Sequence, residues 1–200
     1  MANVIQHLAE ISKGYKVFED NQVLTKEPLN ALVDYLDDQE RLTRVALLGV
    51  GIVCGLRVSL SDATVVLTKG VGVTTDGDLL RAPEDLAYTR FRLYDQTAPK
   101  YDAFYAGATM RTVFELVGED VSSAPKLTTF TAQTGKKVGD MVAVLLMESA
   151  LRDLDLCTGG DCDNKGQDAL SNVRLLLLDP ADVAALREKL PTLDAASRQL

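Results

Sequence analysis

The fold is decided by residues Val23 to Leu80, VLTKEPLNALVDYLDDQERLTRVALLGVGIVCGLRVSLSDATVVLTKGVGVTTDGDLL. Thr25 is a suitable N-cap, and Pro28 lies in the first helical turn, where its missing N–H costs little. Beyond them, apolar residues recur at helical spacing with charged residues opposite, and Gly49 or Gly51 supplies a stop. The apolar stripe consists of Leu29, Leu32, Val33, Leu36, Leu42 and Val45. The pattern predicts one amphipathic helix over residues 29–48 that ends at a glycine corner.

The second half of this stretch predicts short strands joined by tight turns. Residues 52–60 and 64–68 are rich in β-branched side chains, with Ser61-Asp62-Ala63 as the hairpin loop between them. Asp76-Gly77 is a strong tight-turn signal after a further strand over residues 71–75. The rest of the chain predicts strands at residues 88–93, 111–117, 141–148 and 173–178 and a loop at 96–100. It also predicts an exposed stretch rich in Ser, Thr and Lys at 121–137, and a last helix from Pro180 to about Leu190, capped by Asp179.

These elements predict an α+β fold with an N-terminal amphipathic helix packed on an antiparallel β-sheet. The sheet is a sandwich or a partial barrel, and a C-terminal strand and helix follow it. We expect three segments along the chain: an N-terminal arm (residues 1–22), a helix plus β-rich assembly domain (23–178), and a C-terminal helical segment (179–200) that could continue in a longer chain.

Composition narrows the function classes. The 200 residues carry a formal net charge of -8, with an isoelectric point near 4.7. Nucleic-acid phosphates require a basic face, and an anionic membrane surface does too, so neither is an expected partner. No window reaches the ~18 apolar residues of a membrane span, and no secretory signal is visible. With only three cysteines, Cys54, Cys157 and Cys162, the expected location is cytoplasmic.

Little in the sequence points to catalysis. His7 is the only histidine, so the sequence contains a single candidate for the base of a catalytic triad that uses histidine. Gly49, Gly51 and Gly55 superficially resemble a phosphate loop, but a helix precedes them and a strand follows, the reverse of the dinucleotide fingerprint. Cys54 lies in an apolar strand and is expected to be an inert buried thiol. We expect no enzymatic activity and no cofactor; a small enzyme is the least favoured alternative.

The remaining candidate is the segment from Cys157 to Asp168, CTGGDCDNKGQD. Asp161 and Asp163 match the first and third positions of a calcium loop, but Lys165 occupies the fifth, where an oxygen ligand is needed. The alternatives are a calcium-stabilised binding module with Asp161, Asp163 and Asn164 as ligands, a zinc site, a Cys157–Cys162 disulfide, or a compact Gly/Asp loop between two β-segments. The last is favoured.

A recurring set of residues runs through the helix, the corner and the strands. It comprises Leu24-Thr25, Leu29-Asn30, Tyr35, Gln39, Arg41-Leu42, Arg44, GIVCGL at 51–56, Gly70-x-Gly72-Val73 and Asp76-Gly77. This set resembles proteins encoded with phage tails and phage-tail-like contractile injection systems. The match covers residues 17–82 well and 156–178 loosely, through the loop LCTGGDCDNKG. Some relatives carry a His-Gly-Trp type sequence at Leu48-Gly49-Val50.

The resemblance implies a non-enzymatic, baseplate-associated structural subunit that acts through protein–protein contacts. Its implied partners are further copies of itself and the baseplate, spike, sheath or fibre proteins of a tail-like particle. It supplies no catalytic residues. Within such an assembly, we expect the outer face of the 29–48 helix and the 157–168 loop to be the contact surfaces.

Overall fold

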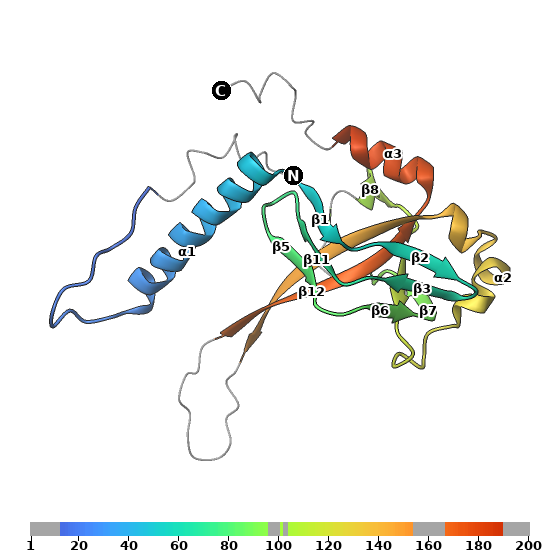
Figure 1. The fold of residues 1–200 in the computed structure, drawn as a ribbon, viewed down its shortest axis with the longest axis horizontal. Coiled ribbons are helices and arrows are strands. Elements are labelled where there is room, and N and C mark those ends of the chain that lie inside the picture. Colours follow the sequence, from blue (N-terminus) through green and yellow to red (C-terminus); the bar gives the residue numbers. More distant parts are fainter. Residues whose placement is uncertain (1–12, 96–100, 102–103, 154–166, 190–200) are drawn as a thin grey trace, which may run out of the picture. The chain divides into compact units, whose positions relative to one another are not determined.

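A computed structural model describes residues 13–95, 101, 104–153 and 167–189 of the chain (Figure 1). The chain divides into two units, and each is described by itself. The first, called the helical unit, comprises Met1–Leu56, Gly70–Arg81 and Leu190–Leu200. The second, called the sandwich unit, comprises Arg57–Lys69 and Ala82–Lys189.

The helical unit is built on α1 (Lys26–Thr43), which continues as one π-helical turn, η1 (Arg44–Leu48). Gly49, with φ 87°, ends the helix in a conformation that favours glycine. The predicted helix and its stop are therefore confirmed. Thr25 occupies the N-cap position, although its side chain makes no capping hydrogen bond.

Three short strands complete the helical unit, in the order β1-β4-β5. They are β1 (Gly51–Gly55), β4 (Gly70–Val73) and β5 (Leu79–Ala82). β1 is an edge strand that pairs antiparallel with β4, and a bulge falls between Ile52 and Cys54. The turn predicted at Asp76-Gly77 joins β4 to β5, and Gly77 has φ 86°.

α1 touches this sheet through polar groups. The Arg41 guanidinium lies 2.8 Å from the carboxylate of Asp78, and Arg44 donates a hydrogen bond of 3.2 Å to the carbonyl of Gly77. The apolar stripe of the helix is covered only in part, because Leu32, Leu42 and Val45 are half-buried whereas Leu29, Val33 and Leu36 are exposed. No residue of α1 is fully buried, so the expected packing of the helix on the sheet is incomplete.

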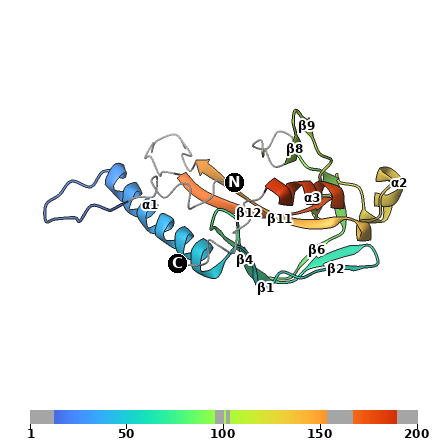
Figure 2. The same ribbon diagram turned by 90° about the horizontal axis from the view of Figure 1, so that it is seen from above.

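The sandwich unit contains two antiparallel sheets that face each other, with α3 on the outer side of the larger one (Figure 2). The smaller sheet has the order β2-β3-β6, and the larger has the order β11-β12-β10-β7. The elements are β2 (Val58–Ser61), β3 (Thr64–Leu67), β6 (Leu86–Tyr88), β7 (Arg90–Leu93), β8 (Tyr105–Ala106), β9 (Thr109–Met110), β10 (Phe114–Val117), η3 (Leu127–Thr129), α2 (Phe130–Thr134), η4 (Val138–Asp140), β11 (Val142–Asp153), β12 (Gln167–Leu178) and α3 (Pro180–Lys189). The α+β class is confirmed.

The core of the sandwich unit is aromatic on one face of the larger sheet. Phe130 is fully buried, and its ring meets Phe91 at 4.8 Å and Phe114 at 5.1 Å between centroids, both edge to face. Most of residues 121–137 are exposed, as predicted, but Ala124, Leu127 and Phe130 are buried. The short helices η3 and α2 in this stretch place the Phe130 ring in the core. On the opposite face, Leu176 and Leu178 pack against Val183 and Leu186 of α3.

Two local predictions in this unit are confirmed. The hairpin between β2 and β3 turns at Asp62-Ala63, with Ser61 opposite Thr64 and Asp62 at φ 52°. Asp179 caps α3, because its carboxylate accepts a 3.1 Å hydrogen bond from the amide of Ala181.

The hairpin of β11 and β12 is longer than the sequence predicted. Its strands pair over twelve residues each, from Val142 opposite Leu178 to Asp153 opposite Gln167. β10 pairs with β12 only along Leu175–Leu177, so the outer half of the hairpin continues past β10 as a two-stranded ribbon (Figure 1).

Candidate assembly surface

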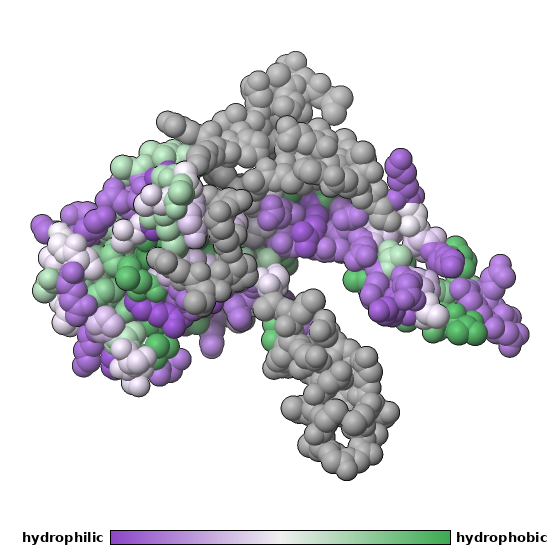
Figure 3. Space-filling model, turned by 180° about the vertical axis from the view of Figure 1, so that it is seen from behind, coloured by the Kyte–Doolittle hydropathy of each residue, from purple (hydrophilic) through white to green (hydrophobic). Residues whose placement is uncertain are grey.

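The exposed apolar side chains of the described residues concentrate in the helical unit. Nineteen large hydrophobic side chains are exposed, and fourteen of them belong to this unit; only Leu56, Val73 and Leu80 are its buried hydrophobics. In Figure 3, apolar residues lie interspersed with polar ones on residues 13–25 and α1, at the right of the view. An unusual concentration of exposed apolar side chains marks a surface that contacts another molecule.

α1 carries the regular part of this surface. Leu29, Val33 and Leu36 lie at i, i+4 and i+7, which places them on one face, and they are 43%, 63% and 54% exposed. Leu47 extends the same face into η1 at 79% exposure. An amphipathic helix of eighteen residues gains little stability from its own sequence, since packing of its apolar face normally supplies it. The face therefore lacks the covering that such a helix requires.

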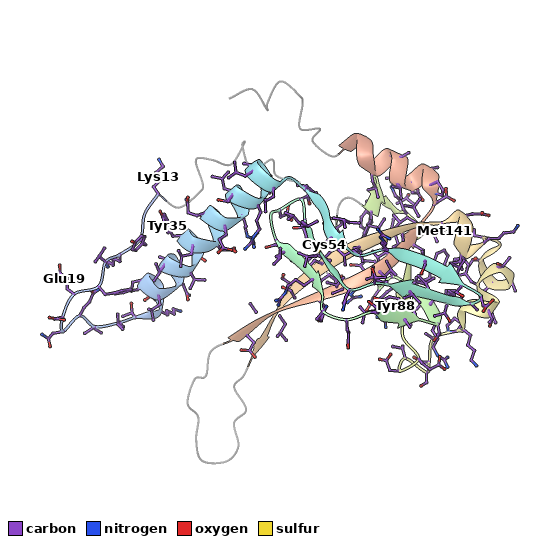
Figure 4. All side chains as sticks on the ribbon, viewed as in Figure 1. Lys13, Glu19, Tyr35, Cys54, Tyr88 and Met141 are labelled. Carbon is purple, nitrogen blue, oxygen red and sulfur yellow. The ribbon has the colours of Figure 1, made fainter. Side chains whose placement is uncertain are left out.

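The arm before α1 adds to this surface. It turns at Asp20-Asn21, and Tyr15 packs against Tyr35, the residue of α1 labelled in Figure 4, with ring centroids 5.1 Å apart. Other apolar side chains of the arm point to solvent, with Val17 at 76% and Val23 at 80% exposure. The arm thus leaves the apolar face of α1 open and presents further apolar side chains of its own.

The edge strand β1 is the third part. All five of its residues are exposed, among them Ile52 and Val53. Cys54, labelled in Figure 4, is exposed as well, so the prediction that its thiol is buried is wrong. A strand with an apolar sequence is normally buried, but β1 lies at the edge of a small sheet that leaves its side chains uncovered.

A shallow hollow of about 340 Å³ lies on the helix formed by α1 and η1. Its lining consists of Leu36, Gln39, Glu40, Thr43 and Arg44. All five residues come from one helix, and the hollow is open to solvent. It can receive a side chain from another molecule, but it is too open to isolate a small substrate from water.

The densest cluster of charged groups lies in the sandwich unit, across the four strands of the larger sheet. Glu115 is 5% exposed, and its carboxylate accepts hydrogen bonds from Arg92 at 2.7 Å and Arg174 at 3.4 Å. Arg174 also contacts Glu148 at 2.7 Å, and the Tyr94 hydroxyl donates a hydrogen bond of 2.6 Å to the same carboxyl group.

These contacts link the four strands of the larger sheet to one another. Burial, helped by the hydrogen bond to Glu148, raises the pKa of the Tyr94 phenol, which keeps it protonated. The hydrogen bond to Glu115 raises the pKa of Arg92, so the guanidinium stays charged. Each carboxylate is paired with an arginine, and none is left in the unpaired, activated state that general acid–base catalysis uses.

The residues that sequence reasoning put forward for chemistry fall outside the described part of the chain. These are the metal-ligand candidates Asp161, Asp163 and Asn164, the pair Cys157 and Cys162, and His7. The predicted loop of the 157–168 segment also lies almost wholly outside the described residues, whereas β11 and β12, the strands before and after residues 154–166, pair with each other. Among described residues, no group of three or more His, Cys, Asp or Glu side chains is placed to hold a metal ion.

Of the two predicted contact surfaces, the structure thus describes the helix face and finds it exposed. Sequence reasoning missed the exposed side chains of the arm and of β1. Their signal was present in the pairs Val17-Phe18, Val23-Leu24 and Ile52-Val53, because adjacent apolar residues cannot all point to one side of an extended chain.

Because the comparisons with known proteins found no match, the exposed apolar surface of the helical unit is the main guide to function. No protein-family model matches the chain, and no curated protein matches it. None of the helices in the described ranges is long and apolar enough to cross a membrane.

Proposed function

We propose that this chain is a non-enzymatic structural subunit of a phage-tail-like contractile injection particle, assembled from a cytoplasmic pool through protein–protein contacts. The observation that carries the proposal is the exposed apolar face of α1, with none of the helix buried within its own chain. A helix of this kind is stabilised when a neighbour covers it, which is the normal situation for a subunit inside an assembly.

The surroundings of this face support the same proposal. The exposed side chains of the arm and of β1 belong to the unit that carries α1, so the candidate contact residues are not confined to one helix. The charged groups of the larger sheet, by contrast, are paired with one another. The residues that resemble tail-associated proteins also lie mainly in residues 17–82, the region that carries these exposed positions.

The direct test is electron microscopy of tail-like particles from the native source, compared between cells with and without this gene. The proposal expects absent or malformed particles in the deletion, and restoration when the gene is supplied on a plasmid. Complementation with a Leu36→Glu variant should fail, because a carboxylate on the apolar face of α1 opposes its burial.

Ala31→Glu is the matched control, since Ala31 is an exposed residue of the same helix outside the apolar face. It should restore particles as the unchanged gene does. Normal particles in the deletion strain would contradict the proposal. Restoration by Leu36→Glu would show instead that the α1 face is not the surface through which the chain assembles.

A further inference from the structure

The two sheets of the sandwich unit are joined at one margin and open at the other. Thr89 alone connects β6, an edge of the smaller sheet, to β7, an edge of the larger sheet, so these edges lie at the same margin (Figure 1). β2 and β11 are the opposite edges of the two sheets and form the second margin, called the open margin. There, a Cβ on Gly139 of η4, which precedes β11, would lie 3.9 Å from the side chain of Leu60 in β2.

The core is incompletely covered at the open margin. Val58 and Leu60 of β2 pair with Leu67 and Val65 of β3, so their side chains lie on the same, core-facing side of the smaller sheet. Leu67 and Val65 are buried, whereas Val58 and Leu60 are 41% and 47% exposed. On β11, Leu145 is likewise only half-buried. The smaller sheet has three strands that face four, and the position beyond β2 is the one without a strand.

The backbone of β2 points to the open margin at the same two residues. The Thr68 amide donates a 2.9 Å hydrogen bond to the Arg57 carbonyl, which makes these two residues a hydrogen-bonded pair. Such pairs alternate along an antiparallel ladder, so Ser59 is the next residue of β2 that bonds to β3. The N–H and C=O groups of Val58 and Leu60 therefore point away from β3. These residues present backbone groups at the sheet edge and apolar side chains towards the core.

We propose that an extended segment of a different protein adds to β2 as the fourth strand of the smaller sheet. The inference rests on the proposed function and adds a contact in the sandwich unit to the helix face. The N–H and C=O groups of Val58 and Leu60 pair with the backbone of the segment, and its side chains at two alternate positions cover theirs. The occupant is a strand because only an extended backbone satisfies the groups along a sheet edge.

The strand count argues against β2 of a second copy as this occupant. Counted from the joined margin, β12 lies opposite β2, and β11 extends one strand beyond it. Pairing β2 with β2 of a second copy about a two-fold axis would bring β11 of each copy into the space of the other copy's larger sheet. A lone segment brings no second sheet with it, so it fits over β11.

Charged residues at the two ends of the open margin define the chemistry of the segment. The exposed Arg57 precedes β2, the exposed Asp62 follows it, and the exposed Asp140 comes directly after Gly139. Antiparallel pairing is the more stable arrangement, and it sets the start of the segment near Asp62 and Asp140 and its end near Arg57. We therefore expect a segment that is basic at its start and acidic at its end, with apolar residues at alternate positions between them.

The first experiment places a photo-crosslinking amino acid at Ser59, whose side chain lies on the outer face of β2, in cells that make the tail-like particles. The expected product joins this chain to a different protein, within a segment that has apolar residues at alternate positions. Leu60→Pro should abolish the product, because proline removes the N–H at the edge. Absence of a product, a product between two copies of this chain, or a product that survives Leu60→Pro overturns the proposal.

The fold of the variant is checked by urea unfolding of the purified chain. Proline is tolerated on an edge strand where its N–H would face solvent, so Leu60→Pro should keep the urea midpoint of the unchanged chain. Ser59→Pro removes an N–H that bonds to β3 and should lower the midpoint. An unchanged midpoint for Ser59→Pro overturns the backbone arrangement. Should Leu60→Pro fail to fold, Leu60→Lys replaces it, because a lysine at an edge blocks strand addition and keeps the backbone groups.

Complementation separates this inference from the proposed function. In a deletion strain that lacks normal particles, Leu60→Lys should fail to restore them. Ser59→Lys is the matched control, since its side chain lies on the outer face of the same strand, and it should restore them. Restoration by Leu60→Lys overturns the added strand and leaves the proposed function standing. Normal particles in the deletion strain contradict the proposed function instead, and the crosslinking result then decides the added strand by itself.

Discussion

Of the twenty-one buried hydrophobic side chains in the described residues, eighteen belong to the sandwich unit and three to the helical unit. Of the nineteen exposed large hydrophobic side chains in the described residues, five belong to the sandwich unit and fourteen to the helical unit. The sandwich unit therefore has a core of its own, whereas the helical unit exposes most of the side chains from which a core would be built.

Under the proposed function, this difference separates the residues that stabilise the fold from those that serve assembly. Burial of apolar surface is the main favourable term in folding, and the sandwich unit obtains it internally. The helical unit leaves the same kind of surface available to a neighbour. Substitutions in the two units should consequently report on different quantities: stability of the single chain for the first, and association for the second.

The largest effect is expected from Phe130→Ala. Phe130 is fully buried between Phe91 and Phe114, and removing its ring leaves a cavity that costs about 3 to 5 kcal/mol of unfolding free energy. Urea unfolding followed by circular dichroism at low protein concentration measures the change. Val33→Ala, which shortens a side chain that is 63% exposed on α1, is the contrasting variant and should shift the curve by less than about 0.5 kcal/mol. Equal effects from both would refute the division between the units.

How far the sequence predicted this division depends on the kind of signal. The helix, its glycine stop and the turns at Asp62 and Gly77 were predictable, because local spacing and backbone conformation determine them. Phe130 was missed because one aromatic residue among Ser, Thr and Lys gives no periodic pattern. The outer half of the β11–β12 hairpin was missed for a related reason: its strands are held by backbone pairing between polar stretches.

The candidate surface was predictable only in part. The apolar stripe of α1 is visible in the sequence, but whether the chain's own sheet covers it is a property of the fold. From the local pattern we expected the sheet to cover the apolar stripe of α1. From the apolar residues next to Cys54 we expected its thiol to be buried. Both depend on a layer of structure over the helix and the edge strand, and local sequence carries no information about such a layer.

A smaller loss of stability is expected from Glu115→Ala in the sandwich unit. The change leaves Arg92 and Arg174 beside an apolar interior without their shared carboxylate. Because Arg92 is partly exposed, we expect the free energy of unfolding to fall by about 2 to 3 kcal/mol, which is less than for a fully buried ion pair. Glu84→Ala is the control: it removes an exposed carboxylate of the same unit and should leave the urea midpoint nearly unchanged.

In the helical unit the sharpest backbone test is Gly77→Ala. Gly77 has φ 86°, and a Cβ there would lie 2.8 Å from the Cβ of Arg41. The backbone strain and the close approach to Arg41 together should lower the free energy of unfolding by about 1 to 2 kcal/mol. They should also weaken the contact between α1 and the turn. Hydrogen exchange read by mass spectrometry should show faster exchange along α1, with the strands of the sandwich unit unchanged. Faster exchange in both units would contradict their independence.

The smallest effect concerns the start of α3 and depends on pH. The hydrogen bond from Lys136, followed by that from the Ala181 amide, lowers the pKa of Asp179 from its ordinary value of 3.8. A lowered pKa means that the carboxylate contributes stability fully above about pH 4 and loses it as the pH falls through the native pKa. Asp179→Ala should therefore lower the melting temperature at pH 7, and the difference from the unchanged protein should shrink towards pH 2. Asp140→Ala, at an exposed carboxylate of the same unit, is the control and should show no such convergence. A difference that stays constant from pH 7 to pH 2 would mean that the side chain acts at this helix start through its shape and not through its charge.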